Sequence, residues 1–379
     1  MKIAIVANTA WYVANFRLNL MAALREAGHE VIAIAPPGED AARIESAGFA
    51  FCSWPLSGRG THPLRELAAV CTLRRHLHRQ SVDWVLSYTP KGNLYAALAR
   101  TGLPHYRQIA NVSGLGSSFL AGNWLTRVVH ALYRLTFRRI DWVFFQNEDD
   151  RQLFLRGRLV EARRCERIAG SGVDLQRFTP MPLPPDEPGQ GRRVLMVARL
   201  LGDKGVREFV AAARSLRQQA LRAGHPLPRF TLLGDPAADN PTAIPPQERA
   251  AWQAEGVVEL AGYEQDVRPW LMRAHLVVLP SYREGVPRTL LEAGATGRPL
   301  VATDVPGCRD PVEHGVNGLL CAVRDPEALA EAIGRLLALP RAELSAMGQA
   351  SAHKMRTEFA EAQVIGRYLE RLNALSDRH

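Results

Sequence analysis

Two short segments in the second half of the chain carry charged side chains at spacings that suit a phosphorylated ligand. In Ala198-Arg199-Leu200-Leu201-Gly202-Asp203-Lys204-Gly205, two cations flank a turn, and in Ser281-Tyr282-Arg283-Glu284-Gly285-Val286-Pro287-Arg288-Thr289-Leu290-Leu291-Glu292, two glutamates are eight positions apart. Fixed cations stabilise a pyrophosphate as it leaves a sugar, and carboxylates can bond the hydroxyls of a sugar and a ribose. Taken alone, each segment is equally consistent with solvated loop cations and surface salt bridges.

Both segments directly follow apolar runs that are typical of buried parallel strands, Arg193–Ala198 and His275–Pro280. Pro287 suits the first turn of a helix, which we expect to run through Arg288–Ala295 and to end near Gly297. The free amides of that first turn, around residues 288–290, would then point at a ligand above the sheet. Such a helix start is a phosphate site by geometry alone.

The alternation of strand and helix patterns continues through the chain and predicts two α/β domains with parallel sheets. The remaining strands are expected at Lys2–Ala7, Glu30–Ala35, Ala50–Trp54, Asp83–Ser87, Tyr106–Asn111, Asp141–Gln146, Phe230–Leu233, Val257–Leu260 and Pro299–Thr303. Helices are expected at Asn15–Ala27, Gly205–Ala223, Asn123–Arg139 and Ala360–Leu375, and a surface loop at Asp239–Gln247.

The length of 379 residues favours two domains, and five prolines between Phe178 and Arg193 indicate a linker. We therefore place an N-terminal domain at 1–178, the linker at 179–192, a C-terminal domain at 193–355 and a last helix at 356–379 that can return to the first domain. Ligands bind at the carboxyl ends of strands in open α/β sheets. Two Rossmann-like domains facing each other across a cleft can thus enclose a pair of substrates.

Composition restricts the class of protein and its partners. No run of 18 apolar residues is present, and Met1–Val6 reads as a strand rather than a signal peptide. The five cysteines form no CxxC pair, which disfavours a disulfide framework or a thiolate zinc site. Residues 1–180 hold 23 Lys and Arg against 14 Asp and Glu, so the net charge of +9 lies in the first half. This basic half predicts an anionic partner, or is a solvated face.

These motifs together resemble the family 4 retaining glycosyltransferases, whose fold is GT-B. The resemblance spans the chain and includes Gly170-Ser171-Gly172-Val173-Asp174, Gly262-Tyr263 and Glu313-His314-Gly315-Val316-Asn317-Gly318. Asn111-Val112-Ser113-Gly114-Leu115-Gly116 and Phe145-Gln146-Asn147 are similar to bacterial enzymes that extend polyprenyl-pyrophosphate-linked oligosaccharides. The bacillosaminyl-lipid N-acetylgalactosaminyltransferases are of this kind. The chain departs from the family in lacking a glycine in Asn8-Thr9-Ala10-Trp11 and a histidine at Ser113.

The resemblance implies α-retaining transfer of a hexose or N-acetylhexosamine from a UDP-sugar to a lipid-linked saccharide. Catalytic roles fall on Glu284, Arg199 and Lys204, and donor contacts on Gly285, Val286, Pro287, Arg288, Thr289, Leu290, Glu292, Gly262, Tyr263 and Gly234. The candidates on the acceptor side are Lys91, Asn111, Ser113 and Arg17. No metal or other cofactor is expected, because the cations can replace a metal and no DxD-type carboxylate pair follows a suitable strand.

The arginines of 123–139, with Arg74, Arg75 and Arg79, indicate a basic and aromatic face that can dock on anionic lipid; a helix packed on the sheet with a solvated outer face is equally consistent. The resemblance further implies a role in capsule or O-antigen assembly, and together with this face it leads us to expect a cytoplasmic protein, peripheral on the inner face of the membrane and without a nucleic-acid partner. Two alternatives stay open, a sugar-nucleotide epimerase of similar fold and a non-catalytic basic module that binds membrane or nucleic acid.

Overall fold

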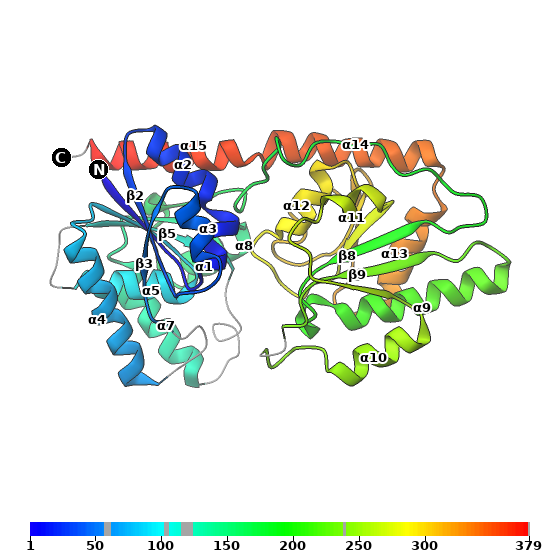
Figure 1. Cartoon of the computed structure of the whole chain (residues 1–379), viewed down its shortest axis with the longest axis horizontal. Helices are drawn as coiled ribbons and strands as arrows, with labels where there is room; N and C mark the ends of the chain where they lie inside the picture. Colours follow the sequence, from blue (N-terminus) through cyan, green and yellow to red (C-terminus); the bar gives the residue numbers. More distant parts are fainter. Residues whose placement is uncertain (57–61, 102–105, 115–123, 238–239, 378–379) are drawn as a thin grey trace. The chain divides into compact units, whose positions relative to one another are not determined.

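The computed structural model describes residues 1–56, 62–101, 106–114, 124–237 and 240–377, without the side chains of 124–128. Leu115, Gly116, Asn123 and Asp239, which the sequence analysis names, lie outside this description, as does the side chain of Arg127, one of the arginines of 123–139. The chain divides into two compact units, unit 1 with residues 1–171 and 365–379, and unit 2 with residues 172–364 (Figure 1).

Unit 1 is built on a parallel sheet of seven described strands in the order β3-β2-β1-β4-β5-β6-β7. The strands are β1 (Lys2–Val6), β2 (Glu30–Ala35), β3 (Ala50–Ser53), β4 (Trp84–Tyr88), β5 (Arg107–Val112), β6 (Trp142–Phe145) and β7 (Cys165–Arg167). Every residue of β4 and β6 is buried, as expected for strands covered on both faces. The short β7 escapes sequence analysis because its pattern, Cys-Glu-Arg, has no apolar run.

The helices of unit 1 are α1 (Ala10–Phe16), α2 (Leu18–Glu26), α3 (Ala41–Ser46), α4 (Pro63–Arg79), α5 (Pro90–Ala99), α7 (Trp124–Phe137), α8 (Glu148–Arg156) and the part of α15 (Glu361–Ser376) from Ile365 onward. Helices α4 and α7 both pack on α5 (Figure 1). The single helix expected at Asn15–Ala27 is instead divided, since α1 ends at Phe16 and α2 begins at Leu18. Arg17 lies between them, and its φ of −129° is not helical. Thr9 caps α1 by accepting a hydrogen bond from the Tyr12 amide at 3.1 Å.

Unit 2 holds a parallel sheet of six described strands in the order β10-β9-β8-β11-β12-β13. The strands are β8 (Arg193–Val197), β9 (Arg229–Leu233), β10 (Glu259–Gly262), β11 (Leu276–Leu279), β12 (Leu300–Thr303) and β13 (Gly318–Cys321). Helices α9 (Val206–Ala223) and α13 (Pro326–Ala338) pack together, as do α12 (Arg288–Ala295) and α14 (Arg341–Glu358) (Figure 1). The shorter helices are α10 (Pro246–Glu255) and α11 (Arg268–Arg273).

The proline-rich stretch 179–192, which the sequence analysis assigned to a linker, packs against unit 2. The buried guanidinium of Arg298 donates to the Pro182 carbonyl at 3.0 and 3.1 Å, and Arg341 donates to the Leu183 carbonyl at 2.7 Å. Proline-rich backbone has few amides to donate, so its carbonyls are satisfied by arginine side chains from the domain beneath. The chain instead passes between the units at residues 171–172 and 364–365.

These two passages are joined within unit 2. Val173 forms a parallel bridge with Ala360, and its amide donates to the Phe359 carbonyl at 2.8 Å. A Cβ on Gly172 would lie 2.4 Å from the Cα of Glu361, so the two segments are in close backbone contact. Residues 172–178, which the sequence analysis placed in the N-terminal domain, therefore belong to unit 2.

Candidate active site

The order of strands locates a ligand crevice in unit 2. From β8 the sheet continues to β9 and β10 on one side and to β11, β12 and β13 on the other, so β8 and β11 flank a topological switch point. Ligands of open α/β sheets bind outside the carboxyl ends of the strands at this point. The loop after β8 carries Arg199 and Lys204, and the loop after β11 carries Glu284.

Lys204 and Glu284 form an ion pair across these two loops, with side-chain exposures of 18% and 15%. Gly205 makes this approach possible, because its φ is +73° and a Cβ there would lie 2.1 Å from the Pro280 carbonyl oxygen. The sequence predicted both residues at strand ends of one domain but not their direct pairing. A half-buried ammonium beside a carboxylate fixes the position of each, and both stay within reach of solvent.

The loop that carries Glu284 is supported from behind. The Glu284 amide donates to the Pro306 carbonyl at 3.1 Å. Gly307 has a φ of +81°, and a Cβ there would lie 2.2 Å from the Gly285 carbonyl oxygen, so a larger residue would push the loop outward. The site therefore depends on two glycines, Gly205 and Gly307, that bring backbone segments together.

Arg199 differs from Lys204 in its surroundings. Its side chain is exposed, and no carboxylate among the described residues pairs with it. The three side chains thus leave one positive charge uncompensated at the switch point. An anionic group such as a pyrophosphate is the kind of ligand that this charge favours.

The helix after the second loop, α12, has the bounds expected from the sequence, Arg288–Ala295. Pro287 is the residue before α12, with ψ at 118°, and Arg288 is the first helical residue. The Thr289 hydroxyl donates to the Val197 carbonyl at 3.0 Å and so ties the helix start to the end of β8. The Leu290 amide donates to the Pro287 carbonyl at 3.1 Å. It is therefore engaged, and any phosphate contact from this turn rests on the amides before it.

Glu292, the candidate for a ribose contact, is held inside unit 2. Its carboxylate lies 2.8 Å from the Arg288 guanidinium and is 14% exposed. Burial raises the pKa of Glu292, while Arg288 opposes that shift. Such a carboxylate can accept a hydrogen bond from a diol without an added charge cost, since its own cation remains in place.

Of the candidates at the ends of β9 and β10, Gly234 is packed against backbone, whereas Gly262 and Tyr263 face open space. A Cβ on Gly234 would lie 1.8 Å from the Ala198 carbonyl oxygen, and its amide donates to the Gly262 carbonyl at 2.7 Å. Only a glycine fits at position 234, and its amide is already engaged and not available to the nucleotide-sugar substrate. Gly262, by contrast, has open space at its Cβ position, and the next side chain, Tyr263, is 59% exposed.

The candidates in unit 1 lie along the carboxyl edge of its sheet, and three of them have other partners. Lys91 pairs with Glu66 at 3.0 Å, so a phosphate would have to compete with that carboxylate. Asn111 is buried and donates to the hydroxyl of Tyr368 in α15 at 2.8 Å. Ser113 is half-buried, and Arg17 is buried among tyrosines. Sequence analysis missed Tyr12, Tyr88 and Tyr368, because the contacts that gather them are long-range.

Two family models cover most of the chain. Residues 13–170 match "Glycosyl transferase 4-like domain" and residues 191–339 match "Glycosyl transferases group 1". The chain is 26% identical over 98% of its length, and 98% of the other's, to the N,N'-diacetylbacillosaminyl-diphospho-undecaprenol alpha-1,3-N-acetylgalactosaminyltransferase of Campylobacter jejuni. The chain belongs to the GT-B glycosyltransferases.

Further likenesses of this GT-B glycosyltransferase extend to polysaccharide biosynthesis. It is 32% identical to the putative colanic acid biosynthesis glycosyltransferase WcaL of Escherichia coli, over 55% of this chain and 51% of that one. The solved structure of Anabaena Alr3699/HepE in complex with UDP and glucose superposes with a TM-score of 0.80, at 17% identity, over 99% of this chain and all of that one. The expectation of a GT-B fold with two parallel-sheet domains is confirmed.

The described parts of this glycosyltransferase contain neither a membrane-spanning helix nor a cluster of metal ligands. The described helices include none that is long and apolar enough to cross a bilayer. Within the same residues, no three histidine, cysteine or acidic side chains cluster as metal ligands do.

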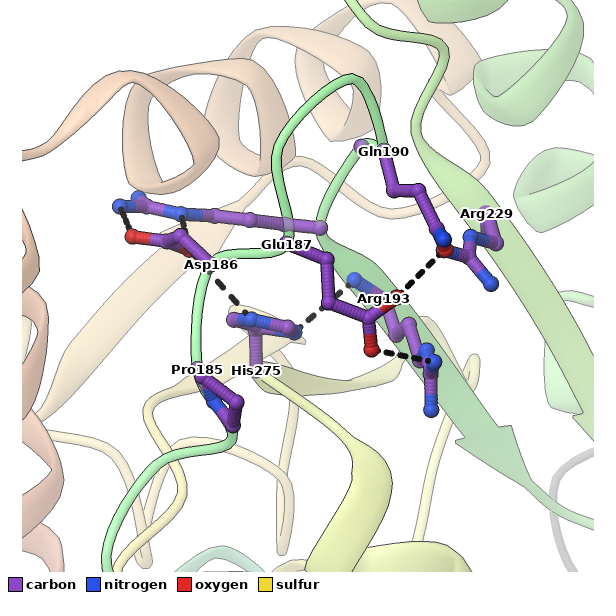
Figure 2. Close-up of a pocket in the computed structure, with 9 residues that line it drawn as sticks. Pro185, Asp186, Glu187, Gln190, Arg193, Arg229 and His275 are labelled. Carbon is purple, nitrogen blue, oxygen red and sulfur yellow. Dashed lines mark hydrogen bonds and ion pairs between the residues drawn. The ribbon is translucent and has the colours of Figure 1, made fainter.

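A separate hollow of the glycosyltransferase lies at the amino ends of β8 and β11, opposite the edge that carries the candidate site (Figure 2). His275 is buried there, accepts a hydrogen bond from the Arg193 amide at 3.0 Å and lies 3.5 Å from Asp186 of the proline-rich stretch. Burial lowers the pKa of His275 to about 4, although Asp186 opposes the shift. The ring is therefore neutral at pH 7, and its Nε2 has no hydrogen-bond partner among the described residues.

Proposed function

We propose that this chain is a family 4 enzyme that transfers a hexose or N-acetylhexosamine, with retention of the α configuration, from a UDP-sugar to a polyprenyl-pyrophosphate-linked saccharide. The observation that carries the proposal is the ion pair of Lys204 and Glu284 at the β8/β11 switch point, with Arg199 on the same loop as Lys204. Two cations and a carboxylate at such a point suit a pyrophosphate with a sugar attached.

Each of these side chains has a task that follows from its chemistry. Arg199 and Lys204 stabilise the negative charge that grows on the leaving β-phosphate as the bond to the anomeric carbon breaks. Glu284, held by Lys204, accepts hydrogen bonds from hydroxyls of the donor sugar, and Glu292 accepts from the ribose diol. The acceptor hydroxyl attacks from the face that the nucleoside diphosphate leaves, and a phosphate oxygen takes its proton. We infer that no metal is required.

The acceptor class is supported by the Campylobacter jejuni relative, whose name gives a diphospho-undecaprenol substrate and which this chain matches over 98% of its length. We propose that this chain likewise extends a saccharide on a polyprenyl pyrophosphate, in the assembly of a capsule, O-antigen or similar glycan. Such a substrate has its head group at the membrane surface, so the enzyme would work on the cytoplasmic face.

An exposed apolar and basic face of unit 1 supports docking on that surface. Leu64 and Leu67 of α4 are 72% and 60% exposed, and Leu135 of α7 is 55% exposed. Arg74 of α4 and Arg139, two residues after the end of α7, donate to the same residue, Thr101, at 3.0 and 3.2 Å. Each arginine near anionic lipid contributes about 1 kcal/mol, so a few suffice for reversible binding.

Transfer assays with a panel of UDP- and GDP-sugars and a short polyprenyl-pyrophosphate saccharide test the function. We expect transfer from one UDP-sugar, with loss of at least about 100-fold in kcat for Lys204→Ala and Arg199→Ala. Arg229→Ala is the matched control, since it removes a cation from the opposite edge of the same sheet. Full activity in all three variants would refute the site, and an epimerised or merely hydrolysed donor would refute the reaction.

Sedimentation with vesicles of anionic phospholipid tests the docking face. Replacing Leu64 and Leu67 by serine is expected to weaken vesicle binding by about tenfold or more, because both side chains would otherwise enter the lipid. Leu221→Ser is the control, as Leu221 is 70% exposed on α9 of unit 2. Equal vesicle binding by the Leu64/Leu67 double variant and the Leu221→Ser control, or binding that does not depend on anionic lipid, would contradict the proposal.

A further inference from the structure

A buried arginine lies at the switch point of unit 1. Arg17 is 2% exposed, and its guanidinium lies 4.0 Å from the ring centre of Tyr88, the last residue of β4. The order of strands reverses between β1 and β4, so the carboxyl ends of these two strands form the ligand crevice of this sheet. Arg17 follows β1 by way of the short helix α1.

The charge of Arg17 has no carboxylate partner in the described part of the chain. Burial opposes this charge, yet the surrounding tyrosine oxygens raise the pKa of Arg17 above its ordinary value. One guanidinium nitrogen donates to the Tyr12 hydroxyl at 2.8 Å and to the Ser171 hydroxyl at 3.0 Å. A buried cation that is stabilised only by neutral groups is costly, and it favours an anion close by.

The two hydroxyls that accept from Arg17 are polarised by its charge and lie nearer the surface than the guanidinium does. An oxygen that accepts a hydrogen bond from a guanidinium still carries its own proton, which it can donate elsewhere. Tyr12 and Ser171 are both half-buried, and neither hydroxyl donates to another described residue. Two polarised O–H donors, backed by one buried cation, are therefore available at the edge of the unit 1 crevice.

A neighbouring residue adds to this edge. Thr89 follows Tyr88 and has a φ of +67°, a strained conformation for a β-branched residue. Its hydroxyl is buried and has no hydrogen-bond partner among the residues that the structure describes. Tyr368, which packs against Tyr88, is buried, and its hydroxyl accepts from Asn111.

We propose that the hydroxyls of Tyr12 and Ser171, polarised by the Arg17 guanidinium, donate hydrogen bonds to a phosphate group of the acceptor. The inference rests on the proposed function, because it identifies the acceptor's pyrophosphate as the anion. Arg17 acts as a positioning residue, since it reaches the ligand only through the two hydroxyls. Lys91, another of the acceptor-side candidates from the sequence, is paired with Glu66 and contributes less.

Direct binding tests the site without requiring transfer. The full chain is saturated with UDP, so that the donor site is occupied, and titrated with inorganic pyrophosphate by calorimetry. We expect the wild type to bind, and the double variant Tyr12→Phe with Ser171→Ala to bind at least about tenfold more weakly, because two charge-assisted hydrogen bonds are lost. Equal affinity of the two proteins would overturn the inference.

A second hydroxyl variant separates binding from stability. Tyr106→Phe removes a buried hydroxyl that donates to the Ala96 carbonyl at 2.6 Å in the same unit. It should lower the free energy of unfolding and leave pyrophosphate affinity unchanged. An affinity loss in this control as large as in the double variant would show a general loosening of unit 1 and would overturn the inference.

Transfer kinetics then identify the source of the phosphate. With a lipid-pyrophosphate acceptor, the double variant should raise KM by about tenfold and leave KM for the donor unchanged. With a neutral alkyl glycoside, its KM should equal that of the wild type, whereas an equal rise for both acceptors would overturn the inference. Pyrophosphate binding that depends on both hydroxyls, without transfer to any acceptor, would refute the proposed function and support the anion site.

Discussion

The substitution Gly205→Ala tests how the pair of Lys204 and Glu284 is assembled. Gly205 has a φ of +73°, and the new Cβ would lie 2.1 Å from the Pro280 carbonyl oxygen. Carbon and oxygen atoms approach to about 3.3 Å, so the turn that carries Lys204 must move by about 1 Å. A displacement of that size in a catalytic group can cost about 100-fold in rate. We therefore expect kcat to fall by about that factor.

The cost in stability has two parts. The left-handed conformation costs an alanine about 1 kcal/mol, and the clash with backbone adds a similar or larger amount. We expect the free energy of unfolding to fall by about 2–3 kcal/mol in urea titrations.

Gly224→Ala is the matched control for this substitution. Gly224 ends α9 with a φ of +67°, and nothing lies within 4 Å of its Cβ position. Only the conformational cost of about 1 kcal/mol applies, with no change in kcat. If Gly205→Ala loses no more stability than this control and keeps full kcat, the argument that Gly205 assembles the site is wrong.

Three further outcomes are expected. Because burial lowers the pKa of His275 to about 4, from an ordinary value of 6.5, the unfolded chain binds the proton first as pH falls. The free energy of unfolding should therefore decrease between pH 6.5 and 4, by on the order of 3 kcal/mol. His275→Asn should flatten this pH dependence in urea titrations at several pH values, and an unchanged slope would exclude His275 as its cause. Glu66→Gln releases the Lys91 ammonium and should tighten pyrophosphate binding several-fold in calorimetry, whereas a weaker affinity would show that the pair is needed intact. Arg298→Leu leaves the Pro182 carbonyl without its donor and should lower unfolding free energy by about 1–3 kcal/mol, and a neutral result would show that water replaces the side chain.

Much of the fold follows from local patterns. The apolar run Glu30–Ala35 forms a strand with the predicted bounds, because a strand buried on both faces needs little beyond continuous apolar side chains. The short edge strand β13 was not predicted, since its four residues, Gly318–Cys321, lie against β12 alone. The break at Arg17 was missed as well, because neither glycine nor proline marks it and the apolar periodicity continues across it.

The candidate site divides in the same way. The strand ends that carry Lys204 and Glu284 could be predicted, since parallel strands in one sheet present their carboxyl ends at one edge. Their pairing could not, because it depends on the contact of Gly205 with a backbone 75 positions away, at Pro280. The partner of Lys91 was hidden for the same reason, as Glu66 is 25 positions distant and on another helix.

The return of the chain to unit 1 at Ile365 has a consequence for synthesis on the ribosome. Tyr368, whose hydroxyl accepts from Asn111, is made only after all of unit 2 has been translated. Until then the nascent unit 1 exposes the pocket that α15 later fills, including the aromatic faces of Tyr88 and Phe144. The first domain to be translated is therefore the last to be completed, and a chain released before Tyr368 would leave the ribosome with that pocket open.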